Sequence, residues 1–219
     1  MFTLVLILLF AAVSAYSLHT YQKDPDDIPH RLGNRMARLW DVAQVSMREG
    51  KLMRSEKALL TILKIDEKNA AAYNRLGILY AKQKEYDDAI DCFEIASTLD
   101  RTASSLHNLG LIYFETDSYE KAGIAFKQAL ELEDTLAARH IAYAKVLERQ
   151  GKTEEMVERL EMAVSIEENQ ETLGLLKKAY KSAGDETKEK AIDKKLRTLI
   201  TPSGKKRRVR KPVKAVIQS

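Results

Sequence analysis

The chain has 219 residues, of which 45% are hydrophobic and 31% charged, the composition of a globular domain with short appended segments. Its single cysteine excludes an internal disulfide and any zinc or iron–sulfur site that needs several thiolates. The net charge of +4 is unevenly spread, because the last fifteen residues carry seven Lys or Arg and no acid, so the rest of the chain is slightly acidic.

The first element is an apolar segment, residues 1–22, which contains no Asp, Glu, Lys or Arg. As a helix rising about 1.5 Å per residue it would span ~33 Å, close to the hydrocarbon thickness of a bilayer. Small residues at 13–15 leave open a second interpretation, a cleaved signal peptide and an exported protein. Because the bases follow the apolar run and none precedes it, we favour a transmembrane anchor, with the rest of the chain in the cytoplasm.

Residues 23–35 are predicted to form a linker. The stretch Asp24–Pro29 (DPDDIP) contains two prolines and three acids. Proline removes a backbone donor and disfavours a helix interior, so this stretch favours a non-helical connection.

The central part of the chain repeats itself at an offset of 33 residues. Asn74–Tyr80 (NRLGILY) aligns with His107–Tyr113 (HNLGLIY). Further on, one set of Tyr, Ala, Phe and Ala recurs at identical spacing in Tyr86, Ala89, Phe93, Ala96 and in Tyr119, Ala122, Phe126, Ala129. The matched glycines, Gly77 and Gly110, predict that a second helix approaches the first closely, while the matched aromatic residues fill the space between helices.

This pattern resembles the tetratricopeptide (TPR) repeat, a helix–turn–helix unit of about 34 residues. Weaker copies flank the two strong ones, and the resemblance therefore implies an all-α TPR solenoid over residues 36–200. Its four or five repeats would cover about 36–69, 70–102, 103–136, 137–169 and 170–200. The last helix is rich in Lys and Glu, as expected of a solvent-facing cap.

In TPR proteins the first helices of the repeats line a concave groove that binds a segment of a partner protein. Carried over to this sequence, the groove positions are Asn74, Ile78, Lys82, His107, Leu111, Phe114, Ile141 and Lys145. Apolar members of this set would anchor an extended or helical peptide, and polar members would orient it. The alternative, that Ile78, Leu111 and Phe114 belong to the core, stays open at this point.

Two functions are disfavoured. TPR domains that hold the carboxylate tail of chaperones use a lysine and an asparagine where this chain has Trp40 and Gln44, so a chaperone-tail receptor is not expected. The four histidines are scattered and no glycine-rich phosphate loop occurs, so we expect no enzymatic activity, metal, cofactor or small-molecule substrate.

The C-terminal segment, residues 201–219, is predicted to be a disordered tail because its charges repel one another. Its basic run comprises Lys205, Lys206, Arg207, Arg208, Arg210 and Lys211. Such a tail would attract anionic lipid or the phosphates of RNA, or would only aid solubility. The sequence as a whole favours a membrane-tethered TPR scaffold that binds a partner protein. The alternatives are an RNA- or ribosome-associated adaptor and an exported TPR protein.

Overall fold

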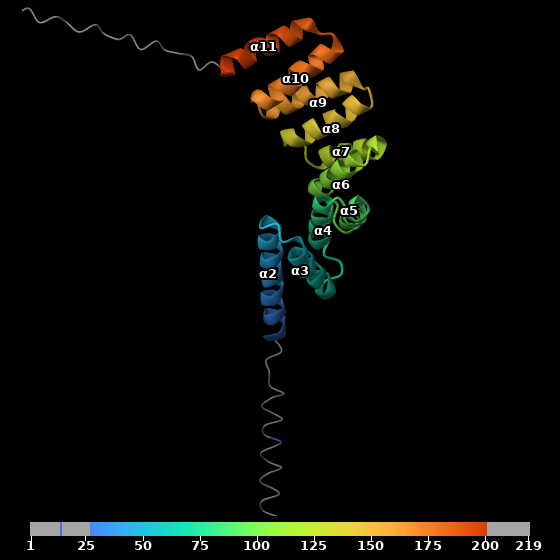
Figure 1. The fold of residues 1–219 in the computed structure, drawn as a ribbon, viewed down its shortest axis with the longest axis vertical. Coiled ribbons are helices and arrows are strands. Elements are labelled where there is room, and N and C mark those ends of the chain that lie inside the picture. The colour runs from blue at the N-terminus through green and yellow to red at the C-terminus, as the bar shows by residue number, and fades with distance from the viewer. Residues whose placement is uncertain (1–13, 15–26, 201–219) are drawn as a thin grey trace, which may run out of the picture. The chain divides into compact units, whose positions relative to one another are not determined.

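The computed structural model describes residue 14 and residues 27–200, which form ten α-helices and, within those residues, no strand (Figure 1). The helices fall into two compact units, of which the first ends at Arg101 and the second begins at Thr102. The first unit contains α2 (Asp27–Arg48), α3 (Leu52–Ile65), α4 (Ala70–Gln83) and α5 (Tyr86–Leu99). The second contains α6 (Ala103–Glu115), α7 (Tyr119–Leu132), α8 (Ala137–Arg149), α9 (Thr153–Ile166), α10 (Gln170–Ala183) and α11 (Glu186–Ile200).

Within each unit every helix packs against the next one along the chain, and successive helices form the pairs α2–α3, α4–α5, α6–α7, α8–α9 and α10–α11. Short turns of two or three residues join the members of a pair, so each pair is a helical hairpin. The first helices of four pairs begin at Ala70, Ala103, Ala137 and Gln170, the residues at which the sequence places the starts of repeats two to five. The all-α TPR solenoid predicted from the sequence is thus the fold of the described helices.

Side-chain caps show why these helices begin where they do. Asn69 accepts a hydrogen bond from the backbone N–H of Ala72 at 3.0 Å at the start of α4. Thr102 and Ser105 form a reciprocal capping box at the start of α6, and Asn169 and Thr172 form another at the start of α10. Each cap satisfies backbone donors that the first helical turn leaves without a partner.

The predicted close approach at the repeated glycines is confirmed. A Cβ atom on Gly77 would lie 2.7 Å from the ring of Phe93, and one on Gly110 would lie 2.9 Å from the ring of Phe126. Both phenylalanines come from the second helix of the same pair and are only 1% exposed. The glycine therefore lets a buried aromatic ring lie directly on the backbone of the first helix.

The second unit ends in a charge-rich helix. Eight of the fifteen residues of α11 are Lys, Arg, Asp or Glu, and Ile192 is its buried contribution to the core. Ion pairs hold the helix to its neighbours, for example Lys177–Asp193 at 2.5 Å and Lys195–Glu168 at 2.9 Å.

The N-terminal region differs from the prediction. Residues 23–35 were expected to be a non-helical linker, but α2 already begins at Asp27 and includes Pro29. A proline in the first turn of a helix removes a donor that has no partner there anyway, which makes Pro29 compatible with a helix start. No helix of the described residues is long and apolar enough to cross a membrane, and the predicted anchor lies outside them except for residue 14.

Candidate functional site

The second unit contains a cleft between its first helices α6 and α8. Five of the eight groove residues predicted from the sequence line it: His107, Leu111 and Phe114 from α6, with Ile141 and Lys145 from α8. The cleft has a volume of about 290 Å³. The spacing of four residues from His107 to Leu111 and from Ile141 to Lys145 corresponds to about one helical turn, which places each pair on one face of its helix.

The three apolar residues predicted for this groove are not buried. Leu111 is 40% exposed, and Phe114 and Ile141 are half-buried. Lys145 is exposed and has no ion-pair or hydrogen-bond partner for its ammonium group among the described residues. The cleft thus combines accessible apolar surface with a free cation, the combination that anchors and orients a bound peptide.

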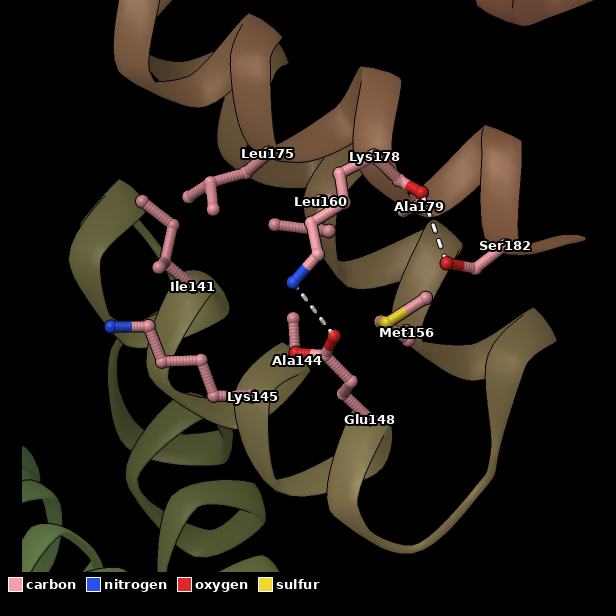
Figure 2. Close-up of a pocket in the computed structure, with 10 residues that line it drawn as sticks. All are labelled: Ile141, Ala144, Lys145, Glu148, Met156, Leu160, Leu175, Lys178, Ala179 and Ser182. Carbon is pink, nitrogen blue, oxygen red and sulfur yellow. Dashed lines mark hydrogen bonds and ion pairs between the residues drawn. The ribbon is translucent and has the colours of Figure 1, made fainter.

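A second, smaller pocket adjoins the first on the other side of Ile141 and Lys145, between α8 and α10 (Figure 2). Ile141 and Leu175 lie at one end of this pocket, and its volume is only about 30 Å³. Lys178 of α10 reaches across it and donates a hydrogen bond to Glu148 of α8 at 3.1 Å. Because both side chains are largely exposed, this ion pair contributes little stability and a ligand could displace it.

His107 lies at the edge of the α6–α8 cleft with one ring nitrogen turned inward. Its Nδ1 is buried and has no hydrogen-bond partner, and its ring contacts that of Phe126 edge-on at 5.4 Å. Burial lowers the pKa of His107, and the nearby positive charge of Arg139 lowers it further. The imidazole is therefore neutral at pH 7 and presents no charge to the cleft.

At the Phe114 end of the cleft, a cation and two aromatic rings form a cluster. The Arg149 guanidinium lies 6.0 Å from the ring centroid of Phe114 and 5.2 Å from that of Tyr119. The amide of Gln150 donates to the backbone carbonyl of Tyr119 at 3.0 Å, and Arg149 also pairs with Asp117. These contacts tie the end of α8 to the preceding repeat and fix the position of the Phe114 ring.

The other three predicted groove residues belong to the first unit, all on α4. Asn74 and Ile78 are half-buried and Lys82 is exposed. The Arg75 guanidinium lies 5.6 Å from the ring centroid of Trp40, so this tryptophan of α2 packs against α4. The first unit has a cleft lined by α3, α4 and α5, and none of the three predicted residues lines it. The predicted basic tail, residues 205–211, lies outside the described residues.

Some lining residues were missed from the sequence. The α6–α8 cleft is also lined by Glu171, and the smaller pocket by Leu175, Lys178 and others of α10. Lys178 could have been predicted from the repeat, because it lies 33 residues after Lys145 and so occupies the equivalent position in the next repeat. The described residues hold no group of three or more His, Cys, Asp or Glu that could bind a metal.

The helix pairs and their glycine–phenylalanine contacts define the class of protein. Residues 68–133 match the tetratricopeptide repeat family, and this stretch contains both contacts. This part of the chain is accordingly assigned to the tetratricopeptide repeat family.

Several solved structures have a similar fold. A crystal structure of MamA is similar with 22% identity and a TM-score of 0.67, over 75% of this chain and 91% of that one. YrrB, described as a TPR protein with an unusual peptide-binding site, has 18% identity and a TM-score of 0.61, over 70% and 80%. PilF of Pseudomonas aeruginosa has 21% identity and a TM-score of 0.63, over 71% and 72%. No curated protein sequence matches the chain.

Proposed function

We propose that this chain is a membrane-tethered scaffold that binds a segment of a partner protein along α6, α8 and α10 of its second unit. One observation carries the proposal: five residues chosen from sequence as groove positions line a single cleft. The peptide-binding site in the description of YrrB, which has the same fold, is consistent with such a role. Binding would consist of placing apolar side chains of the partner against Leu111, Phe114 and Ile141 while Lys145 pairs with an acidic or carbonyl group.

The tether rests on the sequence of residues 1–22, which is apolar and free of charged residues. Holding the repeat domain at a membrane would raise the local concentration of a membrane-associated partner. Extraction of membranes at alkaline pH tests this part of the proposal. A chain that remains in the pellet only when residues 1–22 are present supports the anchor, and a mature chain that begins at Tyr16 contradicts it.

Site-specific crosslinking tests the cleft. A photoreactive residue at position 138, which also lines the cleft, should crosslink to a partner on membranes. Leu111→Asp should abolish that crosslink, since a carboxylate in the apolar cleft costs binding energy on desolvation. Ile124→Asp is the matched control, because Ile124 is an exposed apolar residue (59%) of α7 that does not line the cleft. Equal crosslinking in the two variants would refute the assignment of the cleft.

A further inference from the structure

Gly174 occupies a groove position of the second unit without a side chain. It is the fifth residue of α10, as Ile141 is of α8 and His107 is of α6, and both of these line the α6–α8 cleft. A Cβ on Gly174 would meet nothing within 4 Å, in contrast to the crowded positions of Gly77 and Gly110. Helix packing therefore does not require this glycine, although glycine destabilises a helix interior relative to alanine.

The residues around Gly174 belong to the groove of the second unit. Glu171, three residues before it, lines the α6–α8 cleft. Lys178, four residues after it, lines the smaller pocket between α8 and α10 (Figure 2). Residues three and four apart lie on one face of a helix, so Glu171, Gly174 and Lys178 share a face of α10. Because Gly174 is exposed, it leaves the main chain of α10 uncovered between the cleft and the pocket.

An open glycine does not by itself indicate binding, as Gly33 of α2 shows. A Cβ on Gly33 would also meet nothing within 4 Å, and Gly33 is likewise exposed. It lines none of the clefts and pockets described above. Gly174 differs by its place in the groove, where a missing side chain lets a ligand approach the helix more closely.

The charged side chains beside Gly174 can pair with the two polar groups of a peptide unit. Along the helix axis, the acceptor Glu171 lies ~4.5 Å before Gly174 and the donor Lys178 ~6 Å after it. Glu171 has no ion-pair or hydrogen-bond partner among the described residues, and Lys178 pairs with Glu148 in an exposed contact that a ligand could displace. The cleft and the pocket together carry three glutamates and two lysines, so their lining does not select a strongly charged segment.

We propose that the main chain of the bound partner segment crosses α10 at Gly174 and is extended there. This inference rests on the proposed function, because it specifies how that segment lies in the groove. An extended peptide exposes N–H and C=O groups along its edges, so its N–H can donate to Glu171 and its C=O can accept from Lys178. A helical segment uses these groups for its own hydrogen bonds and covers its main chain with side chains.

Substitution of Gly174 separates this role from a structural one. Gly174→Ala should make the fold more stable, because alanine favours a helix and the new Cβ meets nothing. The same Cβ should hold the partner's main chain away from α10 and weaken binding about tenfold. Gly174→Leu should weaken binding further. Gly33→Ala is the matched control, which should also gain stability but leave binding unchanged.

The test uses the full-length chain in detergent micelles and short peptides selected against it from a random library. Peptides that no longer bind Leu111→Asp are groove ligands, provided that circular dichroism shows this variant to be folded. Their dissociation constants are measured by fluorescence anisotropy for the unaltered chain, the two Gly174 variants and Gly33→Ala. Urea unfolding of the same proteins measures stability, so that a gain in stability and a loss of binding are seen in one variant.

N-methylation of the peptide, one amide at a time, then locates the contact. It removes a single main-chain donor and adds bulk to the main chain, so binding should be lost at only one or two positions. At those positions N-methylation and Gly174→Ala should be non-additive, because either change alone already separates the peptide main chain from α10.

Three outcomes overturn the inference. Groove ligands that bind both Gly174 variants as tightly as the unaltered chain would leave the groove in place but exclude the main-chain contact. Equal losses on N-methylation at every internal position would show a helical occupant. If no selected peptide depends on Leu111, the proposed function fails together with this inference.

Discussion

Replacing Gly110 by alanine tests the packing of the repeat most directly. The added Cβ would lie 2.9–3.0 Å from three atoms of the Phe126 ring, well inside ordinary van der Waals contact. That ring is 1% exposed and also contacts His107, so it has little room to retreat. Gly174 of α10 is the matched control, because a Cβ there would meet nothing within 4 Å.

Two effects of opposite sign decide the outcome. Alanine is better than glycine in a helix interior by about 0.8–1.0 kcal/mol. Overpacking a rigid core costs about 1–3 kcal/mol. Gly174→Ala should therefore raise the free energy of unfolding by roughly 0.5–1 kcal/mol, whereas Gly110→Ala should leave it unchanged or lower it by up to about 2 kcal/mol. Gly77→Ala should cost more than Gly110→Ala, since its Cβ would lie 2.7 Å from Phe93.

Urea unfolding followed by far-UV circular dichroism measures these differences, and an unchanged m-value shows that the midpoints can be compared. A smaller residue at position 126 should recover part of the loss in the Gly110→Ala background, so that Gly110→Ala with Phe126→Leu is less destabilised than the sum of the two changes. If Gly110→Ala stabilised the chain as much as Gly174→Ala does, the glycine would not be needed for the approach of Phe126.

The remaining predictions concern the edges of the α6–α8 cleft. Since burial lowers the pKa of His107 in the folded state, the unfolded chain binds a proton first as the pH falls through about 6.5. The contribution of His107 to stability should therefore be present above that pH and lost as the pH falls through the lower folded pKa. The variant His107→Gln should remove this loss from a profile of stability against pH measured by thermal melting. An unchanged profile would contradict the prediction. Arg149→Ala should lower the free energy of unfolding by about 0.5–2 kcal/mol through loss of its contacts with Phe114 and Tyr119. Arg149→Met, which keeps a long apolar chain but no charge, separates packing from charge in the same urea assay, and equal stability of all three proteins would dismiss the cluster.

The helix pairs could be predicted from the sequence because their packing is local and recurs. Gly77 and Phe93 belong to one hairpin, and the same two residue types return 33 positions later in the next. The start of α2 could not be predicted by the same means. Pro29 indicates an end to helical structure unless its position within the first turn is already known.

The candidate site was predicted in part, for a physical reason. Helical periodicity tells which side chains share a face, which sufficed to group Leu111 with Ile141. It does not give the distance between helices of neighbouring repeats, on which the width of a cleft depends. The large cleft beside Met53 was therefore missed, although every residue that lines it was visible in the sequence.

The composition of α11 also affects what can pack against the end of the described helices. A stack of helix pairs is inherently open-ended, since each apolar face invites another pair or another molecule. Here the terminal hairpin offers a solvated surface of alternating sign, which would have to lose its hydration before anything could add to it. The charged face of α11 thus disfavours the packing of another apolar helix pair against the end of the described helices.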